Sequence, residues 1–219
     1  METERMRHTI TVVGIGPGDP AYLLPQARAA IHDARVLVGG RRALADLAPA
    51  EVRTHAIGAD VAEVLTFIRD ALRDDDVVVM VSGDPGYYSM LDALRRTFPP
   101  EQMAVIPGIS SLQFAFARLA LPWHDARLLS FHGREPRAEE LARTADAVLG
   151  MLTDGKHNSQ TIAKRLLSSG WRADDMMYIA TRLSYADENI VRTTLGDAAR
   201  DEGIGHGVII VCAVKEDDA

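Results

Sequence analysis

Short apolar runs that end at glycine recur through the first half of this 219-residue chain, and they constrain its fold more than any other feature. The runs cover residues 9–13, 35–38, 77–81 and 103–106. Runs of this length, rich in valine and isoleucine and ended by a turn-forming residue, are typical of β-strands. Because polar and apolar residues do not alternate in them, we expect strands that are buried on both faces, as in a mostly parallel sheet.

Helical periodicity fills the intervals between these runs. Between residues 61 and 72, valine, leucine and isoleucine recur at spacings of three and four, which predicts one apolar stripe along a helix. Asp60 precedes that stripe and is a suitable N-cap. A second apolar stripe follows Ser110 and Ser111. Strands that alternate with helices predict the α/β class.

The second half of the chain has a different pattern. Strand-like runs at 128–131 and 147–152 are followed by a helical segment, and three further runs at 176–180, 190–193 and 208–214 lie close together. This spacing predicts a sheet with more hairpin pairing. The turn-rich stretch at 121–124 (LPWH) separates the two patterns. We therefore expect two α/β domains, at about 1–120 and 121–219.

Composition and charge exclude several classes of protein. A net charge of -7, from 24 basic and 31 acidic residues, disfavours general nucleic-acid binding, although a local basic patch can still bind a small anion. With Cys212 as the only cysteine and no metal-binding histidine spacing, neither a disulfide nor a metal site is expected. No apolar run approaches the roughly 18 residues of a membrane span, and the N-terminus lacks the core of a secretory signal. We expect a cytoplasmic protein.

The first glycine-rich motif, at 14–19 (GIGPGD), only partly resembles a dinucleotide-binding turn. Its third glycine comes one residue early, Pro17 lacks a backbone N–H and Asp19 would repel a phosphate. A nicotinamide oxidoreductase is therefore disfavoured. Two interpretations stay open, a tight turn without a ligand and a loop whose backbone approaches an uncharged or cationic ligand.

Two further motifs follow strands at the edge where α/β proteins bind ligands. In the motif at 82–87 (SGDPGY), Asp84 suits a ribose diol or an amine, and the alternative is an N-cap for the next helix. In the motif at 107–111 (PGISS), Ser110 and Ser111 begin a helix. Their hydroxyl groups suit capping, which is compatible with contact to a ligand.

Taken together and in this order, the three motifs resemble those of the tetrapyrrole methylases, which use S-adenosylmethionine (SAM). The resemblance covers nearly the whole chain. The stretches at 110–134 (SSLQFAFARLALPWHDARLLSFHGR) and 152–171 (LTDGKHNSQTIAKRLLSSGW) are similar to the precorrin-6Y and cobalt-precorrin methylases that act at C5. The resemblance implies two α/β domains with a cleft between them, and methylation of C5 of a precorrin or cobalt-precorrin in cobalamin synthesis.

The resemblance also implies roles for individual residues. The positions that match SAM contacts are Pro17, Ser82, Gly83, Asp84, Tyr87, Ser110, Ser111, Leu152, Leu183 and Gly207. Asp19 matches a position that faces the tetrapyrrole in relatives. No catalytic dyad stands out in the sequence and the catalytic residues stay unknown, which agrees with a reaction that depends mainly on orientation of the reactants.

A tetrapyrrole that carries many carboxylates needs cations in its binding site. We expect Arg41, Arg42, Arg134 and Lys156 to supply them, since arginine contacts carboxylates in a bidentate manner. The alternative is that these are ordinary surface charges. The resemblance further implies a homodimer and a C15-methylating and decarboxylating partner, either separate or fused in a longer parent protein.

Three alternatives to C5 methylation stay open. A methylase of the same family that acts on uroporphyrinogen III, another corrin intermediate or diphthine would carry the same three motifs. A SAM-binding module without turnover is compatible with the lack of an evident base, and a nicotinamide oxidoreductase is disfavoured as described above.

Overall fold

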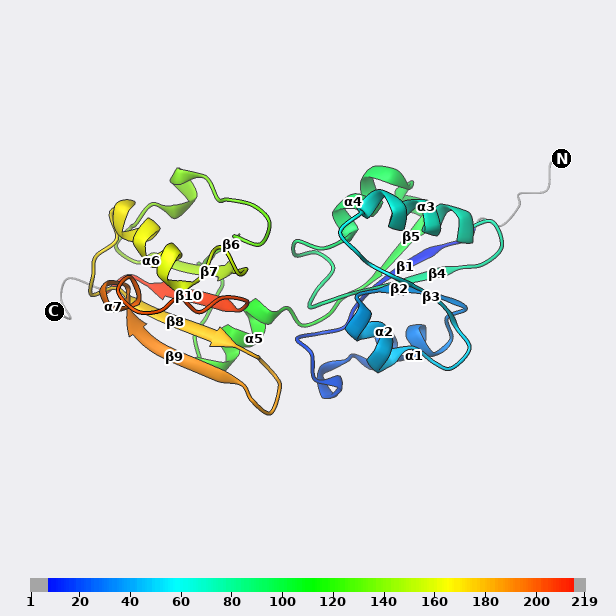
Figure 1. Ribbon diagram of the computed structural model, residues 1–219, viewed down its shortest axis with the longest axis horizontal. Coiled ribbons are helices and arrows are strands. Elements are labelled where there is room, and N and C mark those ends of the chain that lie inside the picture. Colours follow the sequence, from blue (N-terminus) through cyan, green and yellow to red (C-terminus); the bar gives the residue numbers. More distant parts are fainter. Residues whose placement is uncertain (1–7, 215–219) are drawn as a thin grey trace. The chain divides into compact units, whose positions relative to one another are not determined.

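The computed structural model describes residues 8–214, and the chain divides between Ser110 and Ser111 into two compact units (Figure 1). Each unit contains one five-stranded sheet with helices packed on it. The α/β class and the two-part organisation are both confirmed. Within the described residues, none of the helices is long and apolar enough to cross a membrane.

The first unit is built on a sheet whose neighbouring strands are all parallel, in the order β3-β2-β4-β1-β5. Its strands are β1 (Ile10–Gly14), β2 (Val36–Gly39), β3 (Arg53–Ala56), β4 (Val77–Val81) and β5 (Met103–Ile106). The runs of valine and isoleucine form the central strands, and Val12 lies opposite Val79 on one side and Val105 on the other. The predicted parallel sheet is confirmed.

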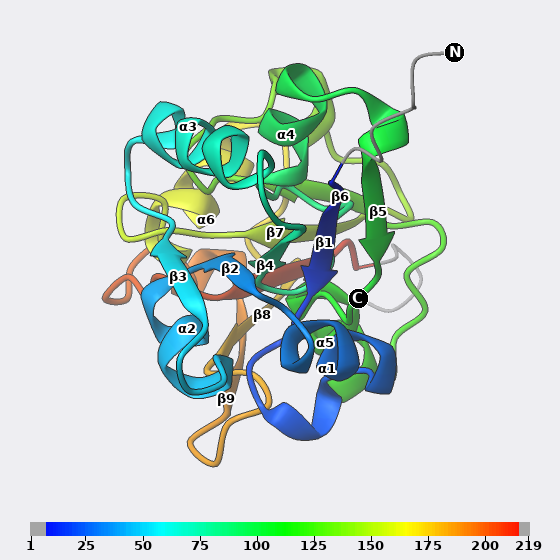
Figure 2. The same ribbon diagram turned by 90° about the vertical axis from the view of Figure 1, so that its right-hand side faces the viewer.

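Helices cover both faces of this sheet. They are α1 (Pro25–His32), α2 (Arg41–Leu47), α3 (Val61–Ala71) and α4 (Leu91–Thr97), with short 3-10 turns η1 (Pro20–Tyr22) and η2 (Pro100–Gln102). Helices α3 and α4 lie on one face, while α1 and α2 lie on the other (Figure 2). On the α3 face, Val64 and Ile68 pack against Val79, and each such fully buried side chain contributes about 1.5–3 kcal/mol.

The start of α3 confirms the predicted cap. The Asp60 carboxylate accepts hydrogen bonds from the backbone N–H groups of Ala62 (2.9 Å) and Glu63 (3.1 Å).

Strand β3, in contrast, is not among the strands that the sequence predicts. Its sequence, Arg-Thr-His-Ala, is polar because β3 is an edge strand whose first two residues are exposed to solvent.

The second unit has a mixed sheet in the order β6-β7-β10-β8-β9. Its elements are α5 (Ser111–Arg118), β6 (Arg127–Ser130), η3 (Ala138–Leu141), β7 (Val148–Leu152), α6 (Ser159–Ser168), β8 (Met176–Thr181), β9 (Asn189–Thr194), α7 (Leu195–Ala198) and β10 (Val208–Cys212). Strands β6 and β7 are parallel, and the other neighbouring pairs are antiparallel, as the clustered strand pattern predicts. Helices α6 and α7 pack on strand residues in the core of this unit, with Ile162 and Leu166 fully buried against the sheet.

Helix α5 determines where the second unit begins. It packs against β7 and β10, and a methyl group at Gly150 of β7 would lie 2.9 Å from side-chain atoms of both Leu112 and Phe116. The apolar stripe of α5 is therefore buried in the second unit. The boundary lies at Ser110–Ser111, earlier than the predicted division after residue 120.

A buried carboxylate anchors the amino end of β8. The Asp175 side chain is fully buried and accepts two hydrogen bonds from the Arg143 guanidinium, at 2.8 and 3.0 Å, and others from the backbone N–H groups of Arg172 and Val214. Burial alone raises the pKa of Asp175, but these hydrogen bonds outweigh it and hold the pKa below its usual value. Removing either partner of such a pair leaves an uncompensated buried charge.

Candidate functional site

The three glycine-bearing loops of the first unit meet at one edge of its sheet. They follow β1, β4 and β5, and because β1 lies between β4 and β5 in a parallel sheet, the three loops leave the same edge side by side. Gly16 and Gly83 exchange two backbone hydrogen bonds, at 3.2 and 2.8 Å, which extend the contact between β1 and β4 beyond their ladder. The motifs at 14–19, 82–87 and 107–111 therefore form one structural cluster, which we call the glycine edge.

Direct backbone contact explains why these loops require glycine. A methyl group at Gly14 would lie 2.7 Å from the backbone nitrogen of Gly108 and 2.7 Å from the carbonyl oxygen of Gly83, and one at Gly108 would overlap that same oxygen. Gly16 and Gly83 also have positive φ angles, 75° and 70°, which side chains disfavour. The glycine edge is thus main chain packed on main chain.

Asp84 fastens two of these loops together. One carboxylate oxygen accepts a hydrogen bond from the backbone N–H of Gly86 (2.8 Å), and the other accepts one from Gly108 (3.0 Å). The alternative role as a cap of the next helix is wrong, because the N-cap of α4 is Met90, which makes no side-chain capping bond. A carboxylate has about four acceptor sites, so Asp84 keeps capacity for a ligand while it holds the loops.

The other predicted residues of the first unit lie on or next to the glycine edge. Pro17 and Tyr87 are half-buried, Ser82 is exposed and Ser110 is buried. The Tyr87 ring meets the ring of Tyr88 edge-on at 4.7 Å, and Tyr88 adopts a left-handed backbone (φ 49°). Strained non-glycine residues of this kind concentrate at ligand sites.

The predicted substrate contacts of the first unit differ in their local structure. The Asp19 carboxylate accepts the backbone N–H of Ala21 (2.8 Å) and caps the turn η1. Arg41 and Arg42 are exposed at the start of α2, directly after β2, which neighbours β4. The structure therefore brings both arginines to the edge of the sheet that carries the glycine loops.

In the second unit, the predicted residues Leu152, Leu183 and Gly207 lie at one end of its sheet. Leu152 ends β7, Leu183 follows β8, and Gly207 precedes β10, whose first residue pairs with Leu152 and with Ala180 of β8. The side chain of Thr153 accepts the N–H of Gly207 (2.8 Å) and donates to its carbonyl (3.0 Å). A methyl group at Gly207 would overlap the Ala180 carbonyl oxygen, which explains glycine at this position.

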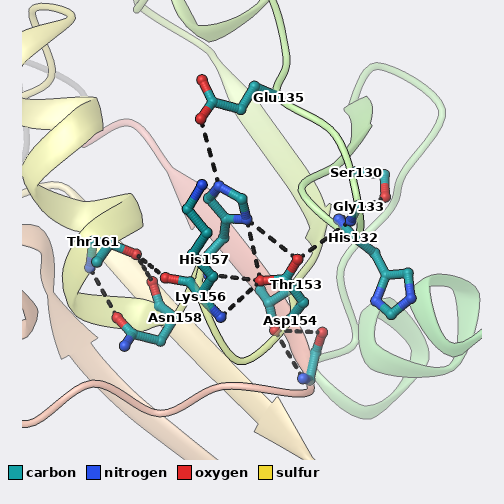
Figure 3. A network of polar contacts seen from close by, with 11 residues as sticks. Ser130, His132, Gly133, Glu135, Thr153, Asp154, Lys156, His157, Asn158 and Thr161 are labelled. Carbon is teal, nitrogen blue, oxygen red and sulfur yellow. Dashed lines mark hydrogen bonds and ion pairs between the residues drawn. The ribbon is translucent and has the colours of Figure 1, made fainter.

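The same end of this sheet carries a polar network that motif reasoning missed. The Asp154 carboxylate accepts the backbone N–H groups of Lys156 (2.9 Å), His157 (2.7 Å) and Gly133 (3.2 Å), so it joins the loop after β7 to the loop after β6 (Figure 3). The N–H of His157 contributes most to lowering the pKa of Asp154 far below its usual value, against the opposing effect of burial. Asp154 is therefore ionised at neutral pH.

His157 lies between two carboxylates in this network. Its Nδ1 is 3.1 Å from an oxygen of Asp154, and because the ionised carboxylate only accepts, Nδ1 is the donor. Its Nε2 is buried, lies 3.6 Å from a carboxylate oxygen of Glu135 and has no hydrogen-bond partner among the described residues. The available signal was an aspartate two residues after a strand with a histidine three residues later, inside the stretch TDGKH.

Arg134 and Lys156, the predicted substrate cations of the second unit, are carried by the two loops that Asp154 joins. Both residues are exposed. Lys156 itself donates its backbone N–H to Asp154, and Arg134 follows Gly133, which does the same. The structure thus brings these two positions to one end of the second sheet, whereas Arg41 and Arg42 belong to the first unit.

Comparison with known proteins gives one family. A description of the tetrapyrrole (corrin/porphyrin) methylases matches residues 9–199. The cobalt-precorrin-7 C(5)-methyltransferase of Salmonella typhimurium is 35% identical over 181 residues, which are 83% of this chain and 88% of that protein. The precorrin-6Y C(5,15)-methyltransferase (decarboxylating) of a Sinorhizobium species is 32% identical over 94% of this chain but only 49% of its own length.

Solved structures show the same fold. The crystal structure of the methyltransferase CobJ matches with a TM-score of 0.80 and 23% identity, and the match covers 93% of each chain. The uroporphyrin-III C-methyltransferase of Thermus thermophilus, complexed with S-adenosylhomocysteine, matches with a TM-score of 0.72 and 24% identity over 94% of this chain and 92% of that one. The two-sheet architecture is therefore that of known methylases.

Proposed function

This chain belongs to the tetrapyrrole (corrin/porphyrin) methylases, and from that premise we propose that it transfers a methyl group from SAM to C5 of a precorrin or cobalt-precorrin, as in cobalt-precorrin-7 C5 methylation. The observation that carries this proposal is the glycine edge, where three loops are packed by their backbones around Asp84. The similarity to a C5-methyltransferase at 35% identity favours C5 over other positions of the macrocycle.

The residues of the glycine edge fit SAM. The loops present backbone groups and a carboxylate, which suit a ribose hydroxyl or an amino group, and Pro17 and Asp19 make the first loop unsuitable for a pyrophosphate. In this proposal Ser82, Gly83, Asp84 and Tyr87 hold the methionine and ribose portions, with Pro17, Ser110 and Ser111 beside them. The adenine contacts expected from Leu152, Leu183 and Gly207 stay predictions.

The residues of this chain then contribute mainly orientation. When bound, SAM supplies an electrophilic methyl group on a sulfonium that is already a good leaving group. The protein has to hold the nucleophilic carbon in line with that methyl group, and rigid positioning of this kind accounts for large rate enhancements without a strong acid or base. The glycine edge supplies rigidity, since its loops are fixed by backbone contacts that cannot shift independently.

Calorimetry with S-adenosylhomocysteine and methyl-transfer assays with separate tetrapyrrole intermediates test this proposal. We expect binding of one S-adenosylhomocysteine per chain and transfer of labelled methyl to cobalt-precorrin-7. Transfer only to uroporphyrinogen III or to another corrin intermediate would keep the methylase but change its substrate. Binding without transfer to any tetrapyrrole would identify a SAM-binding module instead.

Three further expectations accompany the proposal. A tetrapyrrole is the substrate class of the family, while a homodimer, a cytoplasmic location and a separate C15-methylating partner stay predictions. The relative from Sinorhizobium, of which this chain matches about half, supports the partner, because that protein is named for methylation at both C5 and C15. Sedimentation of the purified chain tests the homodimer, co-purification with a C15-methylating protein tests the partner, and cell fractionation tests the location.

A further inference from the structure

We propose that Asp154 and His157 are positioning residues that hold Arg134 and Lys156 where they receive the carboxylates of the tetrapyrrole. The proposal rests on the proposed function, because it concerns recognition of the same substrate. It assigns a role to a polar network that neither the sequence motifs nor the comparisons explain. The network lies entirely within the second unit.

Asp154 is the first part of the argument. Its carboxylate binds the backbone of Lys156 directly and the backbone of Gly133, the residue before Arg134. These hydrogen bonds cross between the loops after β6 and β7, two parallel neighbours in the sheet. Gly133 has a positive φ angle of 66°, so its backbone geometry here is one that a side chain would disfavour. One ionised group therefore sets the spacing of the two loops that carry the cations.

His157 is the second part. Its ring donates to Asp154 through Nδ1, and Nε2 faces Glu135, the residue after Arg134 (Figure 3). Glu135 in turn lies 3.3 Å from the Arg165 guanidinium of α6. Arg134 is thus bracketed along the chain by two residues, Gly133 and Glu135, that are tied to the body of the second unit.

The pairing of charges around Arg134 and Lys156 is the third part of the argument. Of the two carboxylates on or beside these loops, Asp154 accepts hydrogen bonds from His157 and from backbone N–H groups, and Glu135 pairs with Arg165. Arg134 and Lys156, carried by the two loops that Asp154 joins, are both exposed to solvent. The His132 ring points away from the network in Figure 3. Carboxylates that are already paired compete less with an incoming anion for the two cations. Cations carried by fixed loops also bind an anion at a lower entropic cost than cations carried by mobile loops.

The test measures affinity for uroporphyrin III, a stable polycarboxylate tetrapyrrole, by fluorescence quenching, and KM for cobalt-precorrin-7. We expect Asp154→Asn to weaken uroporphyrin binding and raise the tetrapyrrole KM by about tenfold, because it removes charge-assisted hydrogen bonds. Both kcat and the affinity for S-adenosylhomocysteine should stay within about twofold. Amide exchange across residues 133–137 should become faster in the same variant.

The contact between His157 and Glu135 is tested by a double-mutant cycle. His157→Asn keeps a donor near the Nδ1 position but loses Nε2, and Glu135→Gln removes the charge that Nε2 faces. We expect each to raise the tetrapyrrole KM by a few-fold and the double variant to have less than the summed effect of the two single ones, since both break the contact between His157 and Glu135. Additive effects of the two substitutions on KM would show that this contact does not position Arg134.

A matched control uses another histidine–aspartate pair of the second unit. His124 and Asp125 form an exposed pair at 2.9 Å, outside the network. His124→Gln and Asp125→Asn should leave the uroporphyrin affinity unchanged. Arg134→Ala and Lys156→Ala, which leave the network intact, should each weaken uroporphyrin binding. If neither does, the cations do not contact the substrate and the proposal is overturned.

The outcomes separate this proposal from the proposed function. If the wild-type chain binds uroporphyrin but methylates no tetrapyrrole, the proposed function fails, and loss of binding in Asp154→Asn still supports positioning. If methylation occurs and Asp154→Asn speeds amide exchange without changing tetrapyrrole affinity, the network is structural only. An equal loss of affinity for S-adenosylhomocysteine would likewise contradict a specific role toward the tetrapyrrole.

Discussion

The two sheets use different means to build the ends at which their predicted site residues lie. At the glycine edge of the first sheet, backbone meets backbone, and Asp84 is the side chain that ties loops there. At the corresponding end of the second sheet, side chains of Thr153, Asp154 and His157 hold the loops. In the first sheet, the loops after three adjacent parallel strands leave one edge together and pack on one another. In the second sheet, β6 and β7 are the parallel pair and β10 enters antiparallel beside β7 at this end, and side chains rather than backbone contacts join the loops.

Gly108→Ala should cause the largest loss, because the new methyl group would meet a backbone oxygen that has no room to move. We expect the free energy of unfolding to fall by about 3 kcal/mol, measured by urea denaturation. Gly58→Ala is the control, since that residue is exposed and a methyl group there would meet nothing within 4 Å. A small effect at Gly108 would show that the glycine edge is more plastic than its packing indicates.

Asp84→Ala should cause the second-largest loss in the free energy of unfolding. It leaves the N–H groups of Gly86 and Gly108 without their partner, which costs about 2–3 kcal/mol, and it should weaken S-adenosylhomocysteine binding about tenfold in calorimetry. Asp76→Ala provides the comparison, because Asp76 also accepts a backbone N–H, from Thr9, but at the opposite edge of the same sheet. Equal loss of ligand affinity in both variants would refute a local role of Asp84.

Asp154→Asn should lower the free energy of unfolding by about 1–2 kcal/mol at neutral pH. The folded-state pKa of Asp154 is depressed, so its ionised form contributes stability above the unfolded-state pKa of about 3.9, and that contribution is lost as the pH falls below it. The stability difference between wild type and variant should therefore be constant above about pH 5 and shrink below about pH 4. Chemical denaturation across this range measures it, and a difference that grows in acid would contradict the assignment.

The double variant Arg41→Ala/Arg42→Ala should show the smallest change in the free energy of unfolding, below about 0.5 kcal/mol, since both side chains are exposed. We expect a few-fold higher tetrapyrrole KM and unchanged affinity for S-adenosylhomocysteine. Arg28→Ala, at an exposed position of α1, is the control. If the double variant loses affinity for both ligands equally, the two arginines do not act on the tetrapyrrole alone.

Local patterns predicted those features whose cause lies within a few residues. The valine runs became β1, β2, β4 and β5, and Asp60 caps α3, because burial and capping act over short stretches. The edge strand β3 escaped prediction, since exposure removes the apolar signal. The apolar stripe of α5 was recognised, but a stripe does not say which sheet buries it, and the boundary was therefore placed too late.

The site was predicted in the same uneven way. The three loops were recognised because glycine and proline mark turns, and the topology explains why they meet. Asp84 accepts the N–H of Gly108 and Asp154 accepts the N–H of Gly133, and in both pairs the two residues are distant in sequence. Contacts of this range depend on strand order, which a single sequence does not reveal.

The close approach of Gly14, Gly83 and Gly108 has a consequence for how enzymes of this kind diversify. Substitutions at these residues lower the stability of the scaffold before they alter its chemistry, through overlap with backbone atoms at Gly14 and Gly108 and through the positive φ angle at Gly83. Exposed neighbours such as Ser82 and Arg41 carry no such penalty. A library that randomises the exposed neighbours and keeps the three glycines gives new substrate preferences the best chance of emerging from a folded population.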